Sequence, residues 1–168
     1  SLVQDDPDVV GRCNFSHGLV RQTLAQDLSP IRRQRIHRHI AEVLETRVGT
    51  SPAELAVHFI AATRPTNADK GIRYATLAGD AAMDALAAED AASWFTQALE
   101  LHLARPNSDE GLRCDLLIKL GTAQRDARDP AFRDTLLDAA ASADRLEDPY
   151  RYVTAALAIT PGGSLSIE

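Results

Sequence analysis

Proline directly after a helix-capping residue recurs along this chain, and this pattern constrains the fold more than any other sequence feature. Ser29-Pro30 and Ser51-Pro52 put a short oxygen side chain at a helix cap and proline at the first helical position. Proline is tolerated there because that N–H has no partner within the helix. Asp129-Pro130 and Asp148-Pro149 mark two further helix starts. The sequence therefore predicts a succession of helices.

The stretch from Phe15 to Leu44 predicts the first two helices in series. Apolar residues recur along both at helical or near-helical spacing: Leu19, Val20, Leu24 and Leu28 in the helix that Ser16 caps, then Ile36, Ile40, Val43 and Leu44 as a buried stripe in the next. Later periodic segments predict helices after Pro52, over 69–87, over 88–104, from beyond Ser108 to about 127, from Pro130 and from Pro149 to 159. We expect no strand after Asn14, so the predicted fold class is all-α.

Composition limits the class of protein. The 168 residues, 45% apolar and 25% charged, suit a globular protein of one domain or two small ones. The net charge of −6 argues against general binding of nucleic acid, which needs a basic surface. Cys13 and Cys114 form no paired-cysteine metal motif and are expected to be reduced thiols of a cytoplasmic protein. No apolar run is long enough to span a membrane.

The chain divides into four predicted segments. Residues 1–14 are polar and acidic, and they are either a disordered end or the last strand of a preceding domain. Residues 15–66 are expected to form junction helices, 67–160 helical repeats, and 161–168 a flexible tail. The chain begins without methionine, so we expect it to be a piece of a longer protein.

The helices also repeat. Gly79, Ala91, Phe95 and Ala98 lie at the spacing of the small and bulky positions of a tetratricopeptide repeat, and Gly121, Leu137 and Ala140 follow at matching offsets. Arg133 stands where the second unit should have a small residue, and the glycines are 42 residues apart rather than about 34. The extra residues fit the loop at 105–108. The predicted architecture is therefore antiparallel helix pairs in an irregular tetratricopeptide-like α-solenoid.

Several blocks of sequence together resemble one particular family. The first block is Phe15-Ser16-His17-Gly18-Leu19-Val20-Arg21 with Leu28-Ser29-Pro30, Arg32-Arg33, Ile36-His37, Ile40-Ala41 and Leu44-Glu45. The second is Ala53-Glu54-Leu55-Ala56 with His58-Phe59, Tyr74, Ala78-Gly79-Asp80 and Ala98-Leu99-Glu100-Leu101. Over about residues 12 to 148 the chain resembles the region that follows the ATPase and winged-helix parts of bacterial signal-transducing AAA-type ATPases of the LuxR and MalT-like kind. Some of these carry an adenylate/guanylate cyclase domain.

The resemblance implies a non-catalytic sensor and interaction region of a multidomain transcriptional regulator. Such a region couples the binding of an unknown small-molecule or protein effector to the neighbouring ATPase domain. ATP, Mg²⁺ and DNA would be bound by other parts of the parent protein, because this chain has no phosphate-binding glycine loop, no cyclase motif and no DNA-reading helix-turn-helix. We therefore expect neither an enzyme nor a cofactor site here.

Four arginines crowd the first turns of the helix that begins at Pro30: Arg32, Arg33, Arg35 and Arg38. Positive charge near a helix N-terminus is unfavourable unless an anion is close, which points to an interdomain or anion contact. The alternatives are a solvated face paired with Glu42 and Glu45, and a nucleic-acid-binding helical domain that uses the same cluster. The negative net charge and the absence of interleaved aromatic residues disfavour nucleic acid.

The other candidate residues have structural interpretations beside the functional ones. His17 and His58 each have one potential metal co-ligand in sequence, Cys13 and Glu54, and no third, so we expect no metal and place these histidines at helix junctions, bonded to backbone carbonyls. Tyr74, Trp94 and Phe95 are expected to pack in the core, with a ligand groove as the alternative. Five acids are expected to form a solvated face: Asp126, Asp129, Asp134, Asp138 and Asp144.

Overall fold

Seven α-helices make up most of the part of the chain that the structure, a computed structural model, describes: residues 3–5, 13–15, 28–64 and 67–160. The helices are α2 (Pro30–Glu45), α3 (Pro52–Ala62), α4 (Asp69–Asp84), α5 (Ala88–Leu103), α6 (Glu110–Asp126), α7 (Phe132–Arg145) and α8 (Pro149–Ile159). None of these helices is long and apolar enough to cross a membrane. The predicted all-α class is confirmed for this body of the molecule.

Two three-residue strands precede the helices. β1 (Val3–Asp5) pairs antiparallel with β2 (Cys13–Phe15), with Val3 opposite Phe15. A strand was one of the two alternatives for residues 1–14, but β2 continues to Phe15, where we predicted the helical stretch to begin. The expectation of no strand after Asn14 is therefore wrong by one residue. The predicted helix after Ser16, His17 and the predicted tail at 161–168 lie outside the described residues.

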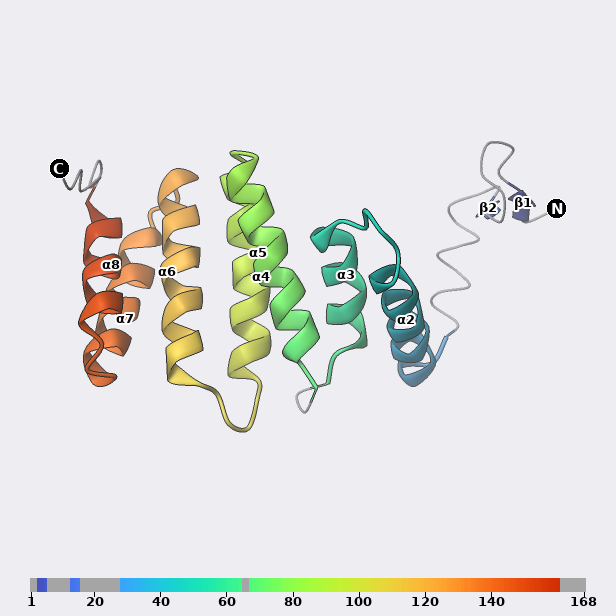
Figure 1. Ribbon diagram of the computed structural model, residues 1–168, viewed down its shortest axis with the longest axis horizontal. Coiled ribbons are helices and arrows are strands. Elements are labelled where there is room, and N and C mark those ends of the chain that lie inside the picture. The colour runs from blue at the N-terminus through green and yellow to red at the C-terminus, as the bar shows by residue number, and fades with distance from the viewer. Residues whose placement is uncertain (1–2, 6–12, 16–27, 65–66, 161–168) are drawn as a thin grey trace.

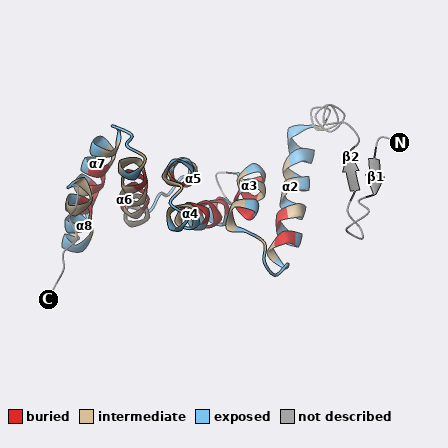
Figure 2. Ribbon diagram, turned by 90° about the horizontal axis from the view of Figure 1, so that it is seen from above, coloured by how far each residue is buried: buried red, intermediate tan, exposed pale blue. Residues whose placement is uncertain are grey.

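The helices lie in a row in chain order (Figure 1). Each helix packs against the next one along the chain, and α8 also packs against α6. In Figure 2 the ribbon is coloured as buried where consecutive helices meet, while the first turns of α2 are drawn as exposed. The core is accordingly a series of small clusters, and the first cluster contains residues of α2, α3 and α4.

Side-chain caps start three of the helices as predicted. Ser29 Oγ accepts from the Arg32 N–H at 3.4 Å and Ser51 Oγ from the Glu54 N–H at 3.2 Å. Asp148 Oδ1 likewise accepts from the Arg151 N–H at 3.0 Å. These bonds satisfy N–H groups that have no partner within the helix, so each helix begins where its cap stands.

Glycines set the distance within two helix pairs. A Cβ placed on Gly79 would lie 2.4 Å from Phe95 Cε1, and one on Gly121 would lie 2.5 Å from Leu136 Cγ. The predicted match of Leu137 to Phe95 is wrong by one residue, because Leu137 is 58% exposed and Leu136 fills the space beside Gly121. The companion small residue is accordingly Ala139, which is fully buried, rather than the predicted Ala140.

The turns between α4 and α5, α6 and α7, and α7 and α8 share one geometry. Each has a non-glycine residue with positive φ, namely Leu86 (59°), Arg128 (60°) and Glu147 (54°). The next residue's N–H in each turn reaches back to a carbonyl five residues earlier, at 2.8 to 3.0 Å. This bond satisfies a carbonyl that the helix end leaves free.

Polar contacts tie the last three helices together. Glu110 at the start of α6 accepts from Ser142 at 2.7 Å and from Arg145 at 2.6 Å, both on α7. These donors hold the pKa of the Glu110 carboxyl at about 2. Arg151 of α8 donates two hydrogen bonds to Asp115 of α6, at 2.7 and 2.9 Å.

We predict that Gly79→Ala destabilises the chain by about 1–2 kcal/mol, measured by urea unfolding. The added methyl meets a Phe95 ring that is 1% exposed and cannot move aside, and this outweighs the helix propensity gained from alanine.

Ala81→Leu, on the exposed side of α4, is the control and should change the free energy of unfolding by less than about 0.5 kcal/mol. A more stable Gly79→Ala variant would contradict the close packing of α4 on α5.

Candidate functional site

Among the described residues, helix α2 buries side chains only in its second half. Ala41 and Leu44 are its buried residues, and no residue from Pro30 to Ile40 is buried. The predicted buried stripe is wrong at two positions, because Ile36 is 44% exposed and Val43 is 48% exposed. The reason is that α2 packs mainly against α3 and meets α4 only near its C-terminal end, so one narrow face suffices for its packing.

Two polar contacts hold the first half of α2 to α3 and its C-terminal end. His37 Nδ1 lies 3.0 Å from His58 Nδ1, with the ring centroids 5.1 Å apart. Arg64 Nε, just beyond α3, donates to Gln34 Oε1 at 3.5 Å. The histidine contact is a hydrogen bond only while one ring nitrogen is unprotonated and can accept. Burial, together with the charges of His58 and Arg33, lowers the pKa of His37.

The second half of α2 is tied to α4 through Glu45. Its carboxylate accepts from Lys70 Nζ at 2.6 Å and from the Tyr74 hydroxyl at 2.7 Å. These hydrogen bonds lower the pKa of Glu45 and raise the pKa of Tyr74. The Tyr74 ring stacks on Phe59 with centroids 5.2 Å apart. Glu45 is therefore engaged with α4 and does not pair with the arginines of its own helix.

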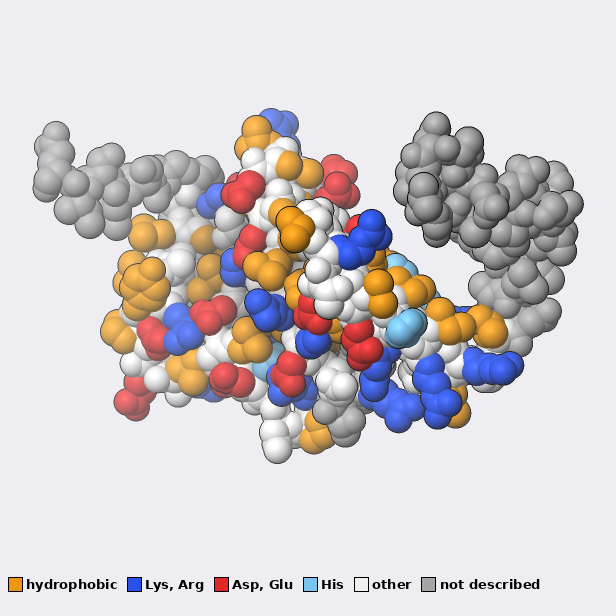
Figure 3. Space-filling view, turned by 45° about the vertical axis from the view of Figure 1, so that its right-hand side comes forward, with side chains coloured by type: hydrophobic (Ala, Val, Ile, Leu, Met, Phe, Trp, Pro, Cys, Tyr) orange, Lys and Arg blue, Asp and Glu red, His pale blue; other side chains and the backbone are white. Residues whose placement is uncertain are grey.

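All four arginines of the α2 cluster are exposed, and basic side chains gather over α2 in Figure 3. Arg32, Arg35 and Arg38 form no ion pair or side-chain hydrogen bond with the described residues.

The charge is also uneven along the chain. Residues 30–64 carry six arginines and three glutamates, whereas 88–160 carry eight basic and thirteen acidic residues. The α2–α3 end is thus the basic end of an acidic chain.

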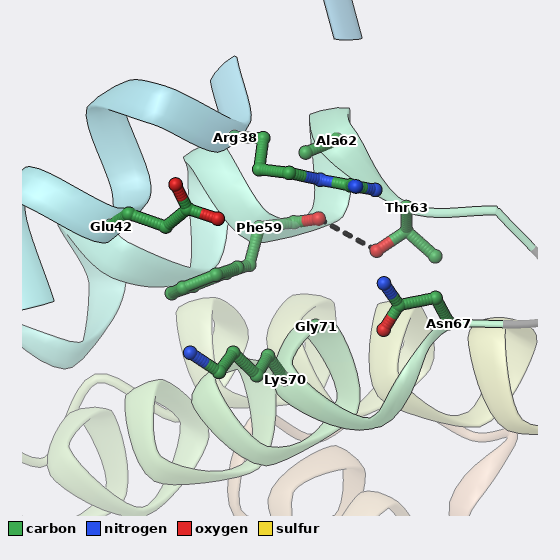
Figure 4. Close-up of a pocket in the computed structure, with 8 residues that line it drawn as sticks. All are labelled: Arg38, Glu42, Phe59, Ala62, Thr63, Asn67, Lys70 and Gly71. Carbon is green, nitrogen blue, oxygen red and sulfur yellow. Dashed lines mark hydrogen bonds between the residues drawn. The ribbon is translucent and has the colours of Figure 1, made fainter. Parts of the chain in front are cut away.

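A pocket of about 160 Å³ lies where α2, α3 and α4 meet (Figure 4). Its walls come from all three helices and from the turn before α4: Arg38, Glu42, Phe59, Ala62, Thr63, Asn67, Lys70 and Gly71. Only Arg38 among the predicted site residues lines it. Sequence analysis missed the rest, because Thr63 and Asn67 lie in a segment that carries only helix-ending residues.

Burial favours core packing over the alternative of an aromatic ligand groove. Tyr74 and Phe95 are 8% and 1% exposed, and they belong to different core clusters. Trp94 is half-buried between the first two clusters. The three side chains therefore act as core residues, which was the structural interpretation of the sequence.

His58 lies inside α3, and its partner is the His37 side chain of α2 and not the predicted backbone carbonyl. Within the described residues no three His, Cys, Asp or Glu side chains converge as a metal site would require. Cys114 is a buried free thiol whose pKa is raised by burial. Of the acids predicted to form a solvated face, Asp138 pairs with Arg113 and Asp126 with Arg125.

Comparison of the chain with protein-family models, curated proteins and solved structures finds no match. The arguments about its site therefore rest on the geometry of the α2–α3–α4 end.

We predict that stability falls between pH 7.5 and pH 5.5 through the histidine contact. The folded-state pKa of His37 lies below the unfolded value of about 6.5, so the unfolded chain binds more protons in this range. Stability is therefore complete above the unfolded pKa and is lost as the pH falls through it. Urea unfolding at the two pH values measures the loss.

His37→Gln should lose less stability over that pH range than the unaltered chain, whereas His39→Gln, on the exposed face of α2, should lose as much. An identical pH response in His37→Gln would show that the contact does not control stability.

Proposed function

We propose that this chain is a non-catalytic sensor and interaction region, built as an irregular tetratricopeptide-like solenoid, of a cytoplasmic multidomain transcriptional regulator. The observation that carries the proposal is the α2 arginine face: Arg32, Arg35 and Arg38, without partners among the described residues. Like charges crowded near the N-terminus of a helix become favourable when an acidic surface lies against them. In this proposal that surface belongs to the neighbouring ATPase domain of the same protein.

Repeated structure supports the solenoid part of the proposal. Gly79 and Gly121, 42 residues apart, each receive a bulky side chain from the following helix. Leu86 and Arg128, also 42 residues apart, form the same type of turn. Close approach within pairs and stacking of each helix on its neighbours are the physical basis of helical-repeat proteins.

Loose anchoring supports the sensor part. The first half of α2 has no buried side chain and is held to the α3 side by the His37–His58 contact and the long Arg64–Gln34 bond. Arg32 and Arg35 of the arginine face sit on this half of the helix, and Arg38 follows it directly. An effector that favours one position of α2 would shift the population of positions and so change how the arginines meet the ATPase domain.

We predict that Arg32→Gln combined with Arg35→Gln changes the ATP hydrolysis rate of the parent protein about fivefold or more. This is the scale of coupling between two sites that share one conformational equilibrium. Stability of the chain should stay within about 0.5 kcal/mol, because both side chains are exposed.

Arg128→Gln with Arg133→Gln is the matched control, since it removes two exposed arginines at the other end of the stack. Equal hydrolysis rates in the two double variants would refute a docking role for the α2 face. Salt-sensitive retention of duplex DNA by the chain, lost in Arg32→Gln/Arg35→Gln, would instead favour the nucleic-acid-binding alternative.

A further inference from the structure

The pocket lies between α2, whose first half buries no side chain, and the packed pair of helices α3 and α4. Gly71 brings α4 close to α3 beside the pocket, because a Cβ there would lie 2.9 Å from Thr63 Oγ1 and 3.0 Å from Leu101 Cδ1. The α3 and α4 walls are therefore packed against each other. Arg38 and Glu42 form the α2 wall. Neither side chain is buried, and the two residues lie on either side of the buried Ala41 in the sequence.

Donors without partners gather at one end of the pocket. In Figure 4 the Arg38 guanidinium reaches over α3 toward Thr63 and Asn67. Arg38 has no acidic partner among the described residues, and the Asn67 side chain makes no hydrogen bond to them. The Thr63 hydroxyl is already used, since it donates to the Phe59 carbonyl at 2.6 Å. Arg38 and Asn67 are thus the free donors at this end.

The other charged groups set the polarity of the pocket. Lys70 is engaged by Glu45 at 2.6 Å and lies 5.0 Å from the centre of the Phe59 ring. The Glu42 carboxylate lies near Phe59, at the other end of the pocket from the Arg38 guanidinium (Figure 4). An anion is therefore favoured at the Arg38 end and opposed by Glu42 at the Phe59 end.

We propose that this pocket binds the phosphate or carboxylate group of a small molecule between Arg38 and Asn67. A guanidinium makes strong, paired hydrogen bonds with such oxyanions, and a side-chain amide adds a donor from the opposite wall. The ligand is small, because the pocket holds about 160 Å³ and Glu42 disfavours further negative charge beyond the first group. An ordered anion would link α2 to the turn before α4.

The regulatory meaning of this site rests on the proposed function. An anion held by Arg38 and Asn67 would add an attachment to α2 just after its first half, which buries no side chain. The position of the arginine face would then depend on the concentration of the ligand. The pocket supplies the effector site that the sensor proposal requires.

The experiment is isothermal titration of this chain with inorganic phosphate and, separately, with malonate, at constant ionic strength set with potassium chloride. Arg38→Gln should weaken binding about tenfold or more, the loss expected for a hydrogen bond to a charged group. Glu42→Gln should tighten binding severalfold by removing the opposing charge. Arg47→Gln, which removes an exposed positive charge outside the pocket, should leave affinity within about twofold.

Saturable binding of either anion with this pattern of variants supports the proposal, and the tighter anion identifies the group that the site prefers. Absence of saturable binding to the folded chain overturns it, as does an equal loss in Arg38→Gln and Arg47→Gln, which would indicate diffuse attraction. Asn67→Asp, which leaves the helices unaltered, should also abolish binding. Titration uses this chain alone, so its failure is distinct from failure of the ATPase test on Arg32 and Arg35.

Discussion

Packing of each helix on its neighbours in sequence is the constraint on which this structure depends. A helix inside the stack is covered on two sides, as α4 is by α3 and α5, whereas α2 packs mainly on α3 among the described residues and meets α4 only near its C-terminal end. Its burial then falls to Ala41 and Leu44, close to its C-terminal end. The arginine face, the histidine contact and the anion pocket all lie along a helix that is held firmly at one end.

Local chemistry made the helices predictable, and tertiary contacts did not follow from it. Ser29 and Ser51 cap helices as expected, because capping involves only neighbouring residues. The phase of α7 was wrong by one residue, because α7 begins at Phe132, later relative to the turn at Arg128 than α5 begins relative to the turn at Leu86. His37 and His58 lie 21 residues apart, and no local pattern indicates that their rings meet.

The candidate site was predictable only as a concentration of charge. Its arginines were evident from the sequence, and the absence of acidic partners for Arg32, Arg35 and Arg38 among the described residues became evident from the positions of the nearby acids. Glu45, the expected partner, bonds to Lys70 and Tyr74 of α4. The pocket was not predictable from the sequence, because its walls come from three helices and Asn67 belongs to no recognisable sequence motif. The same contact that removes Glu45 from the arginines also fixes the base of α2, so anchoring and charge exposure have one origin.

Amide hydrogen exchange resolved along α2 is the most direct test of this account. We expect residues 31–39 to exchange with a distinctly lower opening free energy than residues 41–45 and the interior of α4, because few buried contacts oppose local opening there. The histidine contact predicts that exchange in the first half becomes faster still at pH 5.5 once the intrinsic rate is corrected for pH. Uniform protection along α2, equal to that of α4, would contradict the claim that α2 is held at one end.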